Sequence, residues 1–503
     1  MRKLLFILAL GLLVTSAYAG GYKTHRMRDG SVLCFERHEV VMPIGSVPAE
    51  PWDAGKVYRV PVILFSFTDC DFSCENPKVF YDRMFNEHGY NLGGGPGCVA
   101  DYFRDQSRGL FNVQFDIIGP VKLTSQQKLS GGGYNDGRPQ MNEAVQAVNS
   151  LVDFSEYDWY GDGKVPAVLF IYAGYGGNEL KSIVAGCIHP NTGGLNKTVD
   201  GVRLQYYSIS NEMWSNNECC GIGTICHEYC HTFGLPDFYP TSGDEFSVLD
   251  EWDLMDGGCY AGDGWFPVNL SIHERELLKW QSPVDLTVST DITDMPSFNE
   301  SGVAYRIVNE AYPSEYYLLE NRQQIGWDFM LPGHGLLISH VDYLKSAWSS
   351  IIVNNNPNHH RFDYIHADGL GFNYYQSIYG TANRRDEYGR SIRLKGSAYP
   401  YTDAEGVVHD ALTDNTSPAA SLFHANSEGS LFMGKPITQI RENDGLISFH
   451  FSDTPDAIVP LSTETVPVAV YDLRGHALPL GNTLSPGIYI IKYADGTTKK
   501  VFR

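Results

Sequence analysis

The stretch GIGTICHEYCHTFGLPDFY, residues 221–239, decides how the centre of this 503-residue chain is organised. Its apolar side chains recur at spacings of three and four, which predicts a helix with one buried stripe. That stripe consists of Ile222, Ile225, Cys226, Tyr229, Cys230 and Phe233. His227 and His231 lie one helical turn apart and point away from the stripe. Gly234 is expected to end the helix, because glycine is common just after a helix C-terminus.

Two histidines one turn apart can reach a single zinc ion. Glu228 projects past the metal, where it can hold a bound water, and the chain reversal after the helix can return Asp237 as a third ligand. Three protein ligands and an open position are typical of a catalytic zinc, whereas a structural zinc usually has four. Asp250 or Glu251 is the alternative third ligand. The competing interpretation, a core helix with ordinary hydrogen-bonded histidines, does not explain why both imidazoles avoid the apolar stripe.

The motif HExxHxxGxxD, followed by EWDLMDGGCY at residues 251–260, resembles the immune inhibitor A-like secreted metallopeptidases (peptidase family M six), which are of metzincin type. The resemblance implies a secreted zinc endopeptidase that acts on proteins or peptides. It assigns one catalytic zinc to His227, His231 and Asp237, and the role of general base to Glu228. Met255 would form the methionine-containing turn beneath the metal.

The same resemblance places a strand at residues 204–209 beside the active-site cleft. We expect this strand to pair with a substrate peptide by β-addition. Two other classes of function stay open. One is a surface adhesin built on a catalytically silent peptidase scaffold, and the other is a zinc amidohydrolase that acts on small amides.

The chain is too long for one ordinary core, and the pattern of apolar and polar residues along it changes near residue 282. Strands alternate with helices before that point, and short alternating strands follow it. We therefore predict an α+β multidomain protein, in which a metzincin-like α/β catalytic domain with an active-site helix precedes an all-β domain and a small C-terminal β-sandwich. The expected segments are a signal peptide (1–19), an N-terminal segment and possible propeptide (20–55), the catalytic domain (56–281), a β-rich accessory domain (282–453), a linker (454–467) and a sorting domain (468–503).

Both ends of the chain point to export. Residues 1–19 combine a basic start, a short apolar run and a small-residue cleavage site, which is the pattern of a secretory signal peptide. After its removal, no segment is long and apolar enough to be transmembrane. The tail, 468–503, resembles the sorting domain of type IX secretion, which implies contact with that secretion machinery. The expected location is outside the cell or at the surface of a Gram-negative bacterium.

The charge balance and one acidic loop complete the predictions. A formal net charge of -22 argues against a nucleic-acid partner, because nucleic-acid binding needs basic patches. Residues 158–164, DWYGDGK, resemble a calcium loop in which Asp158 and Asp162 would be ligands. Because Tyr160 replaces an expected oxygen ligand, a simple turn is the alternative interpretation.

Overall fold

The structure is a computed structural model, and it describes residues 24–26, 32–34, 52–179, 181–242, 248–371, 385–392, 394–455, 467–472, 477–478, 488–493 and 498–502. The predicted signal peptide (1–19) and most of the predicted linker (454–467) lie outside these residues. The chain divides into two compact units, 1–453 and 454–503. In the first, β1 (Thr24–Arg26) pairs antiparallel with β2 (Val32–Cys34).

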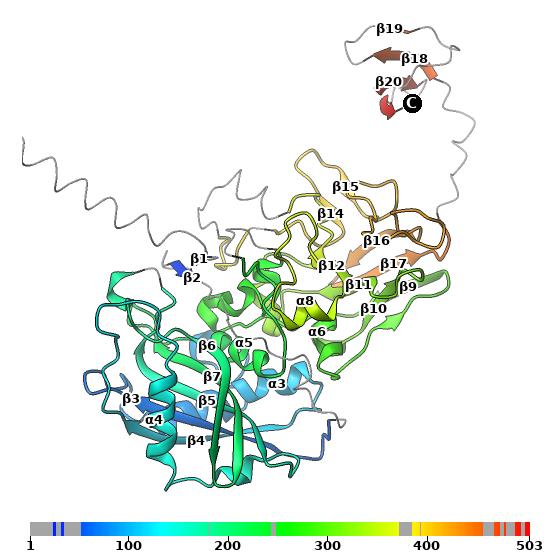
Figure 1. Cartoon of the computed structure of the whole chain (residues 1–503). Coiled ribbons are helices and arrows are strands. Elements are labelled where there is room, and N and C mark those ends of the chain that lie inside the picture. Colours follow the sequence, from blue (N-terminus) through cyan, green and yellow to red (C-terminus); the bar gives the residue numbers. More distant parts are fainter. Residues whose placement is uncertain are drawn as a thin grey trace, which may run out of the picture. The chain divides into compact units, whose positions relative to one another are not determined.

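A five-stranded sheet forms the centre of the first part of unit 1 (Figure 1). Its order is β4-β3-β5-β7-β6, with bounds Val113–Lys122, Tyr58–Ser66, Lys164–Tyr175, Val202–Met213 and Asn191–Val199. β4, β3, β5 and β7 are parallel, and only β6 runs antiparallel. β3 and β5 are buried almost throughout, as expected for parallel strands covered on both faces.

The expectation that residues 204–209 would pair with substrate is wrong. These residues belong to β7, which is hydrogen-bonded to β5 on one side and to β6 on the other, so its backbone is already paired. The edge of the sheet on this side is β6.

Helices cover both faces of the sheet. Val62 and Leu64 of β3 pack into the core shared with α2, α3 and α5, while Ile63 and Phe65 face the core shared with α4. The helices of the first part of unit 1 are α2 (Pro77–Asn86), α3 (Val99–Gln106), α4 (Arg138–Val148), α5 (Gly223–Thr232) and α6 (Ile272–Leu277), of which α6 packs on β11 and not on this sheet. Short 3-10 turns lie at Leu92–Gly94, Phe154–Tyr157, Ser182–Val184, Asp250–Trp252, Gly257–Gly264 and Gly326–Met330.

The second part of unit 1 is rich in strands. A five-stranded sheet, β13-β12-β11-β10-β8, has bounds Phe362–Tyr364, Gly335–Asp342, Glu315–Arg322, Ala304–Val308 and Val284–Asp285. A three-stranded sheet contains β16 (Ile437–Asn443), β17 (Leu446–Phe451) and β9 (Thr290–Met295). The remaining elements are β14 (Tyr401–Thr402), β15 (Val408–His409), α7 (Phe298–Ser301) and α8 (Lys345–Ser349).

The two parts of unit 1 share one hydrophobic core. Leu337, Trp348 and Phe362 of the β-rich part belong to the same buried cluster as Phe233 and Trp280 of the first part. The rings of Phe238 and Phe362 meet edge to face, with their centroids 4.7 Å apart. One buried cluster of unit 1 therefore spans the change of sequence pattern near residue 282, while each part also has a buried cluster of its own.

The second unit contains one four-stranded antiparallel sheet of order β19-β18-β20-β21. The bounds of these strands are Ala477–Leu478, Pro467–Asp472, Ile488–Tyr493 and Thr498–Phe502. Val470 and Ile491 are its buried pair. The predicted β-sandwich and the sorting role of this unit stay predictions.

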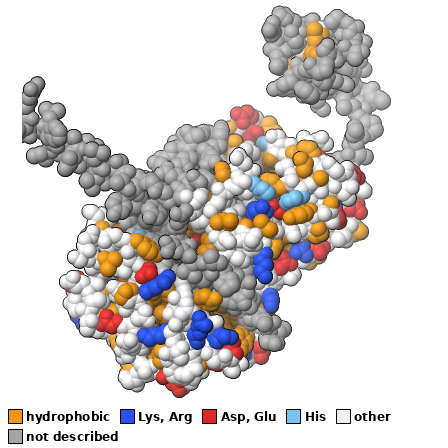
Figure 2. Space-filling model, viewed as in Figure 1, with side chains coloured by type: hydrophobic (Ala, Val, Ile, Leu, Met, Phe, Trp, Pro, Cys, Tyr) orange, Lys and Arg blue, Asp and Glu red, His pale blue; other side chains and the backbone are white. Residues whose placement is uncertain are grey.

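Charged side chains of both signs lie on the surface (Figure 2). On the face of the molecule shown in Figure 2, Lys and Arg side chains lie among acidic and polar ones. Among the described helices, none reaches the length and hydropathy needed to cross a bilayer.

Candidate metal centre

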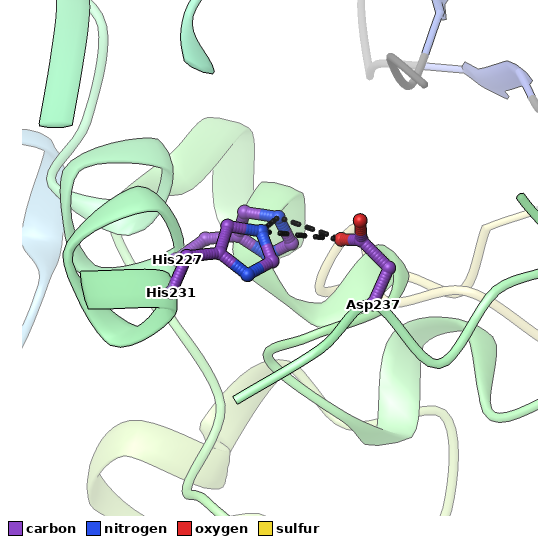
Figure 3. A group of neighbouring side chains, drawn as sticks. All are labelled: His227, His231 and Asp237. Atoms are coloured by element: carbon purple, nitrogen blue, oxygen red, sulfur yellow. Dashed lines mark hydrogen bonds and ion pairs between the residues drawn. The ribbon is translucent and has the colours of Figure 1, made fainter. Parts of the chain in front are cut away.

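Three donor side chains converge at the C-terminal end of α5 (Figure 3). The Nε2 atoms of His227 and His231 lie 3.2 Å apart, and each lies 3.3 Å from Oδ1 of Asp237. All three side chains are buried. The turn that returns Asp237 begins at Gly234, whose positive φ of 94° is favourable for glycine.

Backbone acceptors orient both imidazoles. Nδ1 of His227 lies 2.8 Å from the carbonyl oxygen of Leu254, and Nδ1 of His231 lies 2.7 Å from that of Leu235. A carbonyl oxygen can only accept, so both Nδ1 atoms carry hydrogen. In the neutral rings the Nε2 lone pairs therefore face each other and the carboxylate.

This donor set fits a zinc ion. Two nitrogen lone pairs and a carboxylate oxygen repel one another unless a cation lies between them. Burial opposes a charged imidazolium, but the attraction of Asp237 is stronger and raises the pKa of His231 to about 9. A tetrahedral zinc with bonds of about 2.0–2.1 Å needs donors roughly 3.3–3.4 Å apart, which is close to the separations found here.

Glu228 is buried beside the ligand pair and is held from the sheet edge. The hydroxyl of Thr192, in β6, donates to the backbone oxygen of Glu228 at 2.6 Å and lies 2.9 Å from its carboxylate Oε2. The next residue along α5, Tyr229, points into an aromatic cluster with Phe103 and Phe233. This packing fixes the rotation of the helix about its axis, and with it the direction of Glu228.

The methionine turn contacts the residues that carry the metal donors. Met255 is fully buried, and its carbonyl oxygen accepts from the backbone N–H of Phe238 at 3.0 Å. Its neighbour Leu254 supplies the carbonyl that orients His227. The turn is therefore tied both to one ligand and to the residue that follows Asp237.

The other candidate ligands have different partners. Glu251 forms an ion pair with Arg385 at 3.4 Å, and neither it nor Asp250 belongs to the cluster of three donors. Asp158 accepts from the backbone N–H groups of Asp162 and Gly163, at 3.2 and 2.7 Å. Asp162 pairs with Lys164 at 2.5 Å. These are the contacts of a turn, and they lend no support to calcium.

Two residues near the site were not predicted. Thr192 lies 36 positions before Glu228, and no spacing rule connects them. Tyr239 hydrogen-bonds to Asp237, and burial, followed by the negative charges of Asp237 and Glu228, raises the pKa of its hydroxyl well above the usual value. The signal for Tyr239 was available, because it follows Asp237 by two residues within the motif.

The helix, the three donors and the methionine turn together define a metallopeptidase-like site. Residues 193–282 match the family model of the immune inhibitor A peptidase M6 catalytic domain. The match includes β7, α5, the methionine turn and α6, and it indicates a peptidase that hydrolyses protein substrates. No curated protein sequence matches the chain.

Proposed function

We propose that the chain is a zinc-dependent endopeptidase that is exported from the cell. His227, His231 and Asp237 would bind one zinc ion, and Glu228 would act as the general base. The observation that carries this proposal is the convergence of three buried donors, 3.2–3.3 Å apart, beside a buried glutamate. The match to the peptidase M6 catalytic domain over residues 193–282 supports the same reaction class.

The roles of the side chains follow from their positions. When bound, a zinc ion in this site would supply Lewis-acid polarisation of the scissile carbonyl and a lowered pKa of water. Glu228 would take a proton on its carboxylate from the attacking water and pass it to the amine nitrogen of the leaving group. Thr192 donates its one hydroxyl hydrogen to the backbone oxygen of Glu228 and lies 2.9 Å from the carboxylate, so it helps to position the proton acceptor before substrate arrives.

Strand β6 is the element best placed to bind an extended substrate. It lies at the edge of the sheet, and Thr192 near its start contacts Glu228. No described strand pairs with its outer side. A peptide added there would be held by main-chain hydrogen bonds, which suits cleavage of unfolded protein segments with varied side chains.

We also propose that the protein is exported, because the sequences at both ends of the chain resemble export signals. Residues 1–19 have the signal-peptide pattern, and residues 468–503 resemble a type IX sorting domain. We infer that this tail is read by secretion machinery and takes no part in catalysis. Cell fractionation of the full chain and of a chain that ends at Asp453 tests this inference. Retention of the shortened protein in the periplasm supports it, and unchanged release contradicts it.

The experiment for the reaction compares the protein with Glu228→Gln on an unfolded protein substrate, with zinc content measured in both. We expect about one zinc in each and cleavage only by the unmutated protein. Glu218→Gln, an exposed glutamate outside the site, is the matched control and should cleave normally. Zinc binding without cleavage of proteins or small amides would favour the scaffold interpretation. Cleavage of small amides alone would favour the amidohydrolase.

A further inference from the structure

The β-rich part of unit 1 contains a pocket that is separate from the metal centre. Its volume of about 320 Å³ is at the lower end of the range of small-ligand sites. His340 of β12 and Asp363 of β13, which both line it, are direct partners across the antiparallel pair and lie on one face of the sheet. Phe362 lies on the other face and packs against Phe238, the residue after Asp237. The two pocket side chains are therefore on the face opposite to the metal centre.

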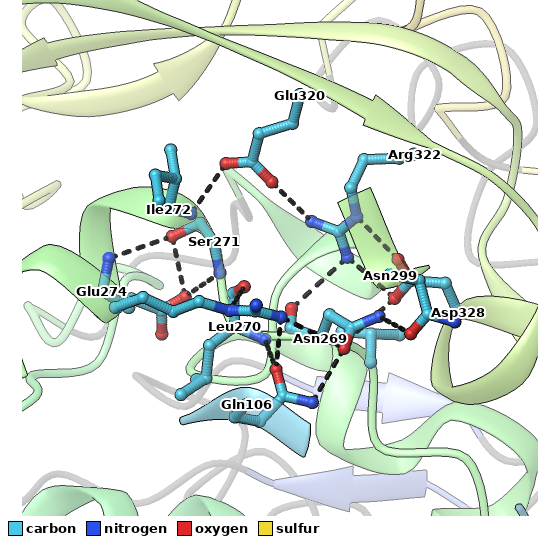
Figure 4. A network of polar contacts seen from close by, with 12 residues as sticks. Gln106, Asn269, Leu270, Ser271, Ile272, Glu274, Asn299, Glu320, Arg322 and Asp328 are labelled. Atoms are coloured by element: carbon cyan, nitrogen blue, oxygen red, sulfur yellow. Dashed lines mark hydrogen bonds and ion pairs between the residues drawn. The ribbon is translucent and has the colours of Figure 1, made fainter. Parts of the chain in front are cut away.

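Buried charges anchor the sheet that carries the pocket. Arg322, on β11 of this sheet, bonds to Asp328 at 2.7 Å and to the backbone oxygen of Asn269 at 3.3 Å (Figure 4). The amide of Gln106, in α3, donates to the side chain of Asn269 at 2.7 Å. All four side chains are buried. The pocket is therefore built on a fixed frame, as is usual for a preformed ligand site.

Hydrogen bonds determine which ring nitrogens of two pocket histidines accept. Nε2 of His340 lies 2.8 Å from the ionised carboxylate of Glu315, so it carries hydrogen, and Nδ1 is the acceptor of the neutral ring. Nδ1 of His366 lies 2.9 Å from the Ser397 hydroxyl, which gives its hydrogen to the Leu394 carbonyl at 2.7 Å. Nδ1 of His366 must therefore donate, and Nε2 is the acceptor. Burial lowers the pKa of His366, which favours its neutral ring.

Asp363 adds a negative charge to these acceptors. Its carboxylate accepts from Nδ1 of His360 and from the backbone N–H of Tyr364, both at 2.7 Å, and its side chain is 28% exposed. Nε2 of His366 lies 3.8 Å from Oδ1 of Asp363, so one donor placed between them can bond to both. Among the residues that the structure describes, no Lys or Arg lines the pocket or pairs with Asp363. The nearby Arg361 pairs with Asp342 at 2.5 Å.

This set of groups suits a ligand with a positive charge and several hydrogen-bond donors. An arginine side chain has five N–H donors and no acceptor, and its guanidinium is less strongly hydrated than the ammonium of lysine. Its methylene stem can pack on the apolar walls of the pocket, which are Pro357, Ile365, Pro418, Ala419 and Phe423. A metal ion is a poorer match, because in the described part of the chain only His227, His231 and Asp237 bring three metal donors close together.

We propose that this pocket binds an arginine side chain of a partner protein, with Asp363 as its counter-ion and the ring nitrogens of His340 and His366 as acceptors. The formal net charge of -22 favours the approach of a basic partner. The site does not depend on the peptidase function proposed above, because its groups are separate from the metal centre.

A ligand-observed NMR titration of the full-length protein tests the pocket with the peptide Ac-Gly-Arg-Gly-NH2 and its citrulline and lysine counterparts. EDTA is present to remove zinc, so that the peptides are not cleaved. Citrulline has the shape of arginine without the charge. We expect saturable binding of the arginine peptide, at least about tenfold weaker binding of the citrulline peptide, and at least about threefold weaker binding of the lysine peptide.

Asp363→Asn removes the charge and keeps the shape of the side chain. The amide oxygen can still accept from the N–H of Tyr364, and the His360 ring can accept from the NH2 group after a change of tautomer. Binding of the arginine peptide should weaken by roughly 10- to 100-fold. Asp403→Asn is the matched control, because Asp403 also bonds to a histidine, His409 at 3.2 Å, and to backbone N–H groups, and it lies outside the pocket.

Four outcomes would overturn the proposal. Equal binding of the arginine and citrulline peptides would show that the pocket does not recognise the charge, and equal binding of the lysine peptide would exclude recognition of the guanidinium. Unchanged binding to Asp363→Asn would place the arginine site elsewhere on the acidic surface. Binding that requires added zinc would show that a metal ion occupies the pocket. The comparison of peptides on the unmutated protein decides the matter even if the variant does not fold, and a lack of peptidase activity leaves it unaffected.

Discussion

Thr192 donates a hydrogen bond from its hydroxyl to the backbone oxygen of Glu228 at 2.6 Å, and the same hydroxyl lies 2.9 Å from the Glu228 carboxylate. This contact joins the edge strand β6 to the active-site helix α5 at the residue proposed to move the proton. The strand proposed to bind substrate and the helix that carries the proposed proton acceptor therefore meet at one side chain.

Replacing Thr192 by valine tests this contact, because valine keeps the shape and removes the hydroxyl. A hydrogen bond between neutral groups is worth about 0.5–1.5 kcal/mol, so we expect kcat/KM to fall by roughly 2- to 10-fold while the zinc content stays unchanged. Thr198→Val, at an exposed position of the same strand, should leave kcat/KM unaltered. Equal activity of the Thr192 variant and the unmutated protein would exclude a positioning role for the hydroxyl.

The third ligand can be identified by neutralising one buried carboxylate at a time. We expect Asp237→Asn to weaken zinc binding by about 100-fold or more, because it removes a charged donor from the cluster. Glu251→Gln should retain zinc, since Glu251 is paired with Arg385. Equilibrium dialysis against zinc buffers measures both. The opposite ranking would assign the ligand to the segment before the methionine turn.

If substrate pairs with β6, every second backbone amide of the peptide should contribute to binding. In an antiparallel pair, alternate residues of the added strand form main-chain hydrogen bonds with the sheet. N-methylation of a peptide substrate at those amides should raise KM by roughly 3- to 10-fold per site, the cost of one lost hydrogen bond. Methylation at the intervening amides is the control and should have little effect. A uniform increase along the peptide would argue against strand pairing.

Glu315, in the β-rich part of unit 1, should make the folded protein less stable in acid. Burial opposes ionisation of Glu315, but hydrogen bonds from His340 and from the backbone N–H groups of Phe423 and His424 outweigh it and hold its pKa at about 2. The folded pKa lies below the ordinary 4.5, so the folded state binds fewer protons than the unfolded state between these values. The stabilisation is therefore present above about pH 4.5 and is lost as the pH falls towards 2.

Urea unfolding at a series of pH values checks this. Ionised Glu315 should contribute up to about 3 kcal/mol to the free energy of unfolding near neutral pH. In Glu315→Gln the slope of stability against pH between 4.5 and 2 should be smaller. Glu310→Gln, an exposed glutamate paired with Lys435, should retain the slope. An unchanged slope in the Glu315 variant would locate the acid sensitivity elsewhere.

The sequence was most informative where the signal is local. His227, Glu228, His231 and Asp237 fall within eleven residues, so helix periodicity and one glycine turn predict how they converge. The alternation of strands and helices before residue 282 was also predicted, because parallel strands covered on both faces, such as β3 and β5, are nearly continuous apolar runs.

Other features depend on contacts between distant segments. β6 reads NTGGLNKTV, with two glycines and few apolar residues, so it was not recognised and β7 was given the edge position. Thr192 reaches Glu228 only because of that pairing. The burial of Asp253 and Glu274 could not be predicted either, since sequence rules place charged residues on the surface.

The guanidinium of Arg322, on β11, donates to Asp328 and to the backbone oxygen of Asn269, which precedes α6. The bond to Asn269 joins a residue before position 282 to a residue after it. The change of sequence pattern near residue 282 would suggest that position as the end of a recombinant catalytic fragment. A recombinant fragment that stopped there would expose the apolar surface that Leu337, Trp348 and Phe362 cover, and Asn269 would lose its partner. A fragment for enzymology should therefore extend at least to Asp453, where the first compact unit ends.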